Sequence, residues 1–149
     1  MQVSDFLRPE NVIVDFAAPS KLKALQLLSA KAAETLGLSE AAILQPLVAR
    51  EKLGSTGIGE GIAIPHTRIA GIDRPFGLLA RLQKPLDFES IDEVPVDIVF
   101  LLLLPPESAK EQLNALACVA RGLRDPDTLK SIRRSATGED VYQALGSAS

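Results

Sequence analysis

The chain contains a single histidine, His66, at the end of a glycine-rich segment that runs REKLGSTGIGEGIAIPH from Arg50 onward. A neutral imidazole is a competent nucleophile near its ordinary pKa of about 6.5, and one of its nitrogens can be oriented while the other attacks. Pro65 pushes Ile64 into an extended conformation and limits the backbone at His66, so we expect the direction of this side chain to be fixed.

The spacing of the glycines excludes two common glycine-rich motifs that bind nucleotides. A dinucleotide-binding fingerprint requires G-x-G-x-x-G, but in both possible registers the third glycine position holds isoleucine, Ile62 or Ile64. A nucleotide P-loop requires a Gly-Lys-Ser or Gly-Lys-Thr ending, which is missing. The glycines can still let backbone N–H groups approach an anion in a concave nest. A phosphoryl group carried on His66 would suit such a nest.

Arg50 is the candidate for holding that phosphoryl group. Phosphoryl transfer mainly needs positioning and charge stabilisation, and a planar guanidinium can bridge two oxygens where Lys52 offers only a point charge. A simpler interpretation of each feature stays open at this stage. A lone histidine can be an ordinary surface or core residue, Arg50 a solvated cation at a helix end, and the glycines a plain loop.

Composition narrows the function classes further. The formal net charge of -3 argues against the basic surface that nucleic acids require. One cysteine, Cys118, cannot form an internal disulfide or, with one histidine, an ordinary closed zinc site, so we expect no metal, no cofactor and a reducing compartment. The start MQVSDF is unlike a secretion signal, and the longest apolar run, Ile98 to Leu104, is far shorter than the roughly 20 residues of a membrane span. We expect a cytoplasmic protein, peripheral at most to a membrane.

Hydrophobic periodicity predicts one domain over residues 1–149, of the α/β class, with a mixed parallel/antiparallel sheet flanked by helices on both faces. The strands are expected at 11–16, 62–64, 77–83 and 96–104. The helices are expected at 20–36, with Leu22, Leu25, Leu28, Ala32 and Leu36 as its apolar stripe, at 39–53, at 107–124, at 126–134 and at 138–145. Pro46 is expected to kink or restart the second helix. In the third, Leu113, Leu116, Ala120 and Leu123 are expected to face inward.

The run LGSTGIGEGIAIPH resembles the active-site signature of the fructose/mannitol-type IIA family of the phosphoenolpyruvate-dependent phosphotransferase system, and especially its nitrogen-regulatory branch. The similarity extends to Lys84–Phe88 and Val96–Leu102, and the spacing of these pieces fits roughly residues 5 to 145. The resemblance implies a single mixed-sheet domain in which His66 accepts a phosphoryl group from a small phosphocarrier protein of the HPr type. It implies that Arg50 neutralises the phosphate.

Four further phosphate-binding positions follow from the same resemblance: Ser55, Thr56, Gly57 and Gln112. The first three form the Ser-Thr-Gly loop of the family. Gln112 falls where the family often has a second histidine, near the start of the long helix. An amide can donate a hydrogen bond but cannot carry positive charge, so it would stabilise a phosphoryl group less than an imidazolium would.

Three functions of different class remain open. The favoured one is a regulatory phosphoryl relay, a histidine phosphotransferase that acts on unidentified target proteins. The second is a sugar-specific IIA component that passes phosphate to a membrane permease, although no apolar permease domain is present. The third is a non-catalytic binding adaptor, which the presence of both His66 and Arg50 disfavours.

Overall fold

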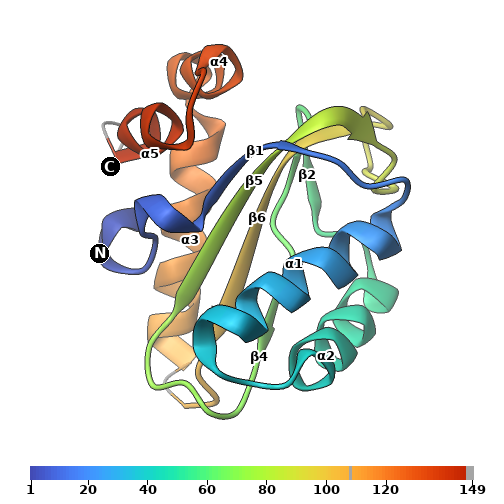
Figure 1. Cartoon of the computed structure of the whole chain (residues 1–149), viewed down its shortest axis with the longest axis vertical. Coiled ribbons are helices and arrows are strands. Elements are labelled where there is room, and N and C mark those ends of the chain that lie inside the picture. The colour runs from blue at the N-terminus through green and yellow to red at the C-terminus, as the bar shows by residue number, and fades with distance from the viewer. Residues whose placement is uncertain (108, 147–149) are drawn as a thin grey trace.

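The computed structural model describes residues 1–107 and 109–146, and in it a mixed sheet lies between two layers of helices (Figure 1). The strands are β1 (Val12–Phe16), β2 (Gly57–Gly59), β3 (Ile62–Ala63), β4 (His66–Arg68), β5 (Phe76–Leu86) and β6 (Val96–Leu104). The helices are α1 (Lys21–Leu36), α2 (Glu40–Leu53), α3 (Ala109–Arg124), α4 (Pro126–Arg134) and α5 (Gly138–Gly146), preceded by 3-10 turns at Val3–Asp5 and Pro9–Asn11. This arrangement confirms the predicted α/β class.

Helices α1 and α2 begin at serine caps. The Ser20 hydroxyl accepts the backbone N–H of Lys23 at 3.1 Å, and Gly37 ends α1 with a φ of 70°, a left-handed conformation that glycine adopts without strain. Ser39 caps α2 in the same way. Helix α2 continues through Pro46, so the expected restart at this residue does not occur.

The sheet has the order β1-β5-β6-β3-β2, and β4 also pairs with β6. Strands β5 and β6 are antiparallel, whereas β1 runs parallel to β5, and β3 and β4 both run parallel to β6. His66 is the first residue of β4, where it lies opposite Leu102. The histidine is therefore anchored by its own backbone to the central strand of the sheet.

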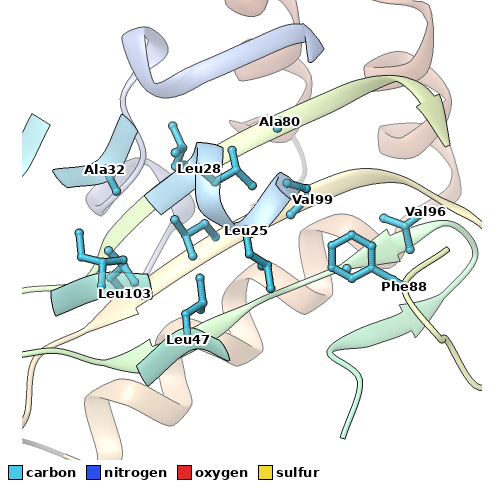
Figure 2. Packing of buried hydrophobic residues seen from close by; sticks show 14 of the residues in the cluster. Leu25, Leu28, Ala32, Leu47, Ala80, Phe88, Val96, Val99 and Leu103 are labelled. Atoms are coloured by element: carbon cyan, nitrogen blue, oxygen red, sulfur yellow. The ribbon is translucent and has the colours of Figure 1, made fainter. Parts of the chain in front are cut away.

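Each face of the sheet has its own hydrophobic core. Figure 2 shows Leu25, Leu28 and Ala32 of α1 and Leu47 of α2 packed toward Ala80 of β5 and Val99 and Leu103 of β6. Helices α3, α4 and α5 cover the other face together with the N-terminal turns. Because both faces are covered, β6 is buried on both sides, which explains its continuous apolar run.

Three expectations from the sequence need correction. Leu22 was assigned to the buried stripe of α1 but is 51% exposed. The sequence predicts no strand between residues 54 and 61, yet Gly57–Gly59 forms β2, which pairs with β3. In α3 the residues facing the sheet are Gln112, Ala115, Cys118, Val119, Gly122 and Leu123. Leu113, expected inside, is 68% exposed.

Over the described residues, no helix combines the length and the apolar character needed to cross a membrane.

Candidate functional site

His66 is oriented by a hydrogen bond to the backbone two residues before it. Its Nδ1 lies 2.7 Å from the carbonyl oxygen of Ile64. A carbonyl can only accept, so Nδ1 must carry the proton and donate it. The proton-free nitrogen is then Nε2, whose lone pair is available for attack. The half-buried ring thus has one nitrogen held and one free, as the sequence suggested.

The surroundings of His66 keep its ring neutral. Burial lowers its pKa below the ordinary 6.5, the bond to the Ile64 carbonyl opposes this shift, the charge of Arg50 lowers the pKa further, and the charge of Glu51 raises it. The net shift is downward. A neutral imidazole is the nucleophilic form, so the site holds His66 in its reactive state at neutral pH.

Arg50 lies in the last turn of α2, and one nitrogen of its guanidinium is hydrogen-bonded within the protein. Its Nη1 donates to the carbonyl oxygen of Gly54 at 2.9 Å. The side chain makes no ion pair within the described part of the chain. A guanidinium has five N–H donors, so this single bond leaves most of them for an anion. Arg50 lies close enough to His66 for its positive charge to lower the pKa of the imidazole.

Glu51, the next residue, is a buried carboxylate that joins three segments. It is 8% exposed and accepts both the backbone N–H, at 3.2 Å, and the side-chain hydroxyl of Thr56. Its other partner is Lys21 of α1, whose Nζ lies 2.7 Å from Oε2 and also donates to the carbonyl of Phe88. This network fixes the loop between α2 and β2, which forms one wall of the site.

The same network revises the predicted roles of the Ser-Thr-Gly loop. The donors of Thr56 are both occupied by Glu51, and the N–H of Gly57 is donated to the Ser55 hydroxyl at 3.0 Å. The Ser55 hydroxyl itself donates to the Phe88 carbonyl at 2.5 Å. These groups therefore hold the loop in place rather than offering an anion nest. Gly57 is required because a Cβ there would lie 2.1 Å from the Ser90 hydroxyl oxygen.

Arg133 of α4 binds the turn between β2 and β3 through hydrogen bonds of its guanidinium. The guanidinium of Arg133 donates from Nε and Nη2 to the two carboxylate oxygens of Asp97, at 2.9 Å each, and from Nη2 to the Glu60 carbonyl at 2.7 Å. Gly61, at a φ of 83°, lies directly beneath this guanidinium, where a Cβ would come within 2.8 Å of Nη2. The clamp places the hairpin that leads into His66.

A cavity of about 390 Å³ opens beside His66. Its polar lining residues are Arg50, Ser55, Thr56, His66 and Arg124. Its apolar lining residues are Ile58, Ile64, Leu113, Leu116, Ala117 and Ala120. The last four lie along one face of α3, which explains why α3 has apolar residues beyond those that cover the sheet. A hollow with a nucleophile, two guanidinium groups and an apolar wall can receive an anionic group presented on a protein surface.

Gln112 does not belong to this cavity. Its side chain is 6% exposed, and its amide nitrogen donates to the carbonyls of Pro105, at 2.7 Å, and Glu107, at 3.2 Å. Both amide protons are used to hold the turn between β6 and α3, so we do not carry Gln112 forward as a phosphate ligand. Leu113, one position later, faces the cavity instead.

The sequence did not single out Glu51, Lys21 or Arg124. A carboxylate directly after the candidate arginine is a weak signal, and its partner Lys21 is far away in the chain. The second apolar stripe on α3 was visible in the sequence, but it was assigned to the core. No group of three or more histidine, cysteine and carboxylate side chains that could hold a metal ion occurs among the described residues.

A family model described as "Phosphoenolpyruvate-dependent sugar phosphotransferase system, EIIA 2" matches residues 5–148. A Bradyrhizobium diazoefficiens protein named nitrogen regulatory protein is 46% identical over 145 residues, which cover 97% of this chain and 95% of that protein. The protein of the same name from Escherichia coli K12 is 36% identical and covers 97% of this chain and 90% of its own length.

Solved structures agree with these sequence matches. The nitrogen regulatory protein IIA-Ntr from Neisseria meningitidis superposes with a TM-score of 0.90 at 31% identity, over 96% of this chain and 98% of that one. The mannitol IIA of Escherichia coli reaches a TM-score of 0.77 at 19% identity, over 93% of this chain and 98% of that one, which shows a shared fold.

The lowered pKa of His66 gives a direct test, because the chain has no other imidazole. We expect the ring resonances, followed by NMR as pH is varied, to titrate with a midpoint below 6.5. Arg50→Gln should raise the midpoint by removing a repelling positive charge, whereas Lys52→Gln, the control on the exposed face of the same turn, should leave it unchanged. A midpoint above 6.5 would contradict the site geometry.

The lowered pKa of His66 also affects stability, because the unfolded chain binds this proton more readily than the folded one. The contribution of the neutral His66 ring to the free energy of unfolding is fully present above pH 6.5 and is lost as the pH falls through the lowered pKa.

Proposed function

This chain belongs to the EIIA 2 family of the phosphoenolpyruvate-dependent sugar phosphotransferase system and is a phosphoryl-relay protein of its regulatory branch; we propose that it carries the phosphoryl group on Nε2 of His66. The observation that supports this assignment above the others is the bond from Nδ1 to the Ile64 carbonyl. That bond leaves Nε2 as the one ring nitrogen able to attack phosphorus.

The proposed transfer uses few groups of this chain. The Nε2 lone pair attacks the phosphorus of a phosphohistidine on the donor, and the new N–P bond forms as the donor's N–P bond breaks, with its electron pair returning to the donor ring. The Nδ1 proton stays in place, and the Ile64 carbonyl stabilises the positive charge that the phosphorylated ring acquires. Such a ring is a good leaving group, which suits a relay that must release the phosphoryl group again.

Arg50 is the proposed phosphoryl ligand. Its side chain lines the same cavity as His66, and the N–H groups that do not bind the Gly54 carbonyl are available to phosphoryl oxygens there. A guanidinium matches two phosphoryl oxygens at once, which a lysine cannot do. The neighbouring Ser55, Thr56 and Gly57 contribute by fixing the loop, as their hydrogen bonds are made within the protein.

The proposed donor is a small phosphocarrier of the HPr type. The apolar wall of α3 gives its surface a place to dock, and Leu113 in that wall is 68% exposed. A relay contact should be small and transient, because the two proteins must separate after each transfer. The donor's phosphoryl group would enter the cavity between Arg50 and His66.

The proposed output is regulatory. Phosphorylation adds about -1.5 to -2 charge at neutral pH, and here it does so in a cavity with an apolar wall. A target protein that contacts the rim of this cavity can therefore distinguish the two forms by charge alone. The names of the similar bacterial proteins, nitrogen regulatory protein, support this output over sugar uptake.

The function is tested by incubation with phosphoenolpyruvate, the first enzyme of the relay and its phosphocarrier, followed by intact-mass measurement. We expect the addition of one phosphoryl group, labile in acid and stable in base as a phosphohistidine is, and none in His66→Ala. Thermal unfolding of His66→Ala serves as the control for folding. Label retained by His66→Ala, or label that survives acid as a serine or threonine ester does, would show that the group is carried elsewhere.

The role of Arg50 is tested by the rate of the same transfer. Arg50→Ala should lower the rate by about 10²-fold, the size of effect typical for loss of a group that stabilises the transition state. Arg50→Lys should also be impaired, because an ammonium cannot bridge two oxygens. Lys52→Ala, two residues along and exposed, is the matched control. Equal rates in Arg50→Ala and wild type would remove Arg50 from the site.

A further inference from the structure

Arg124 lines the same cavity as His66, but no role follows for it from the chemistry described above. It is the last residue of α3, and it continues the face that carries Leu113, Leu116 and Ala120. From Leu113 to Arg124 the helix rises by about 16 Å. The α3 wall therefore begins with an exposed leucine and ends with a cation.

Arg124 has no polar partner among the residues that the structure describes. The side chain is exposed, and neither a hydrogen bond nor an ion pair is found for it within residues 1–107 and 109–146. The nearest carboxylate in sequence, Asp125, is committed elsewhere: it caps α4 by accepting the backbone N–H of Thr128 at 3.0 Å and its hydroxyl at 2.7 Å. The guanidinium is free to bind a group that comes from outside.

The favourable interaction of a cation with the end of a helix does not distinguish this residue. Arg121 lies in the same last turn and has the same relation to the helix dipole. Its charge acts on Cys118, which faces the sheet, and it does not line the cavity. The difference between the two arginines is that Arg124 faces the docking wall.

Arg50 is better placed than Arg124 to act on the phosphoryl group itself. The charges that shift the pKa of His66 come from Arg50 and Glu51, at the end of α2. Helix α3 follows β6 and runs back along the sheet (Figure 1), and Arg124 is the last residue of this helix. Arg124 therefore lies at the C-terminal end of the apolar wall of the cavity, where it can meet the body of a docked protein.

We propose that Arg124 is a specificity-determining residue that pairs with a carboxylate on the surface of the docked phosphocarrier. The proposal rests on the function proposed above. Charges on the rim of an interface steer the encounter of two proteins and select partners, and Arg124 is an exposed cation at the rim of this cavity. Arg50 receives the phosphoryl group, and Arg124 fixes the orientation of the carrier along α3.

The test compares Arg124→Gln with Arg121→Gln as donor concentration and salt are varied, with the phosphorylated HPr-type carrier as donor. We expect Arg124→Gln to raise KM by about three- to tenfold with kcat within twofold of wild type, and to weaken the dependence of KM on salt. Arg121→Gln should match wild type. Phosphoramidate, a small phosphoryl donor that has no protein surface and releases ammonia, should label His66 at the same rate in all three proteins.

A charge exchange identifies the partner group. Arg124→Glu should raise KM further, and changing one carboxylate of the carrier to lysine should restore it. Equal effects of the two arginine substitutions, an unchanged KM in Arg124→Glu, or slower labelling of Arg124→Gln by phosphoramidate would overturn the proposal. If the wild-type protein accepts no phosphoryl group from either donor, both the proposed function and the role of Arg124 are wrong. If the wild-type protein accepts the group normally and Arg124→Gln has the same KM, only the role of Arg124 is wrong.

Discussion

The buried carboxylate of Glu51 is the interaction on which the site depends. Removing a carboxylate from water costs several kcal/mol unless its charge and lone pairs are satisfied. Here Lys21 supplies the opposite charge and Thr56 supplies two donors. The requirement to satisfy one anion thus brings the start of α1, the end of α2 and the loop before β2 to one place. Arg50 takes its position from the end of α2 that this ion pair fixes, and His66, held by the pairing of β4 with β6, faces the same cavity.

Opposing effects act on the pKa of His66, and their net result lowers it. Burial and Arg50 favour the neutral ring, while the Ile64 carbonyl and Glu51 favour the charged one. A ring in this balance can gain charge when it is phosphorylated without a large rearrangement of its surroundings, because the groups that favour the charged form are already in place. The apolar wall of α3 strengthens each of these effects by excluding water. Reactivity and reversibility then come from the same set of contacts.

Local patterns in the sequence were enough to predict most of the helices and strands. Serine caps and Gly37 gave the limits of α1, and the apolar run of β6 gave a central buried strand, because such features act through neighbouring residues. His66 was proposed as the phosphoryl carrier on equally local grounds, because the glycine-rich segment and Pro65 directly precede it. Contacts between residues far apart in the chain could not be predicted in this way. Lys21 and Glu51 are 30 residues apart (51 − 21), and no local pattern in the sequence indicates that they form an ion pair.

Gln112 shows how a shift of one residue along a helix changes the surroundings of a side chain. Its position near the helix start suggested a phosphate ligand, but its side chain is buried against the turn before α3, whereas Leu113, the next residue, lines the cavity.

The clamp made by Arg133 has a consequence for biosynthesis. Its guanidinium joins Asp97 and the Glu60 carbonyl, so the hairpin before His66 is locked by a residue that leaves the ribosome 73 residues after that hairpin (133 − 60). Strands β1 to β6 all precede α4 in the chain, so the sheet can assemble during translation before Arg133 has been synthesised. A nascent chain that ends within α3 has its histidine without its clamp. The hairpin before His66 therefore acquires this restraint later in synthesis than the strands that surround it.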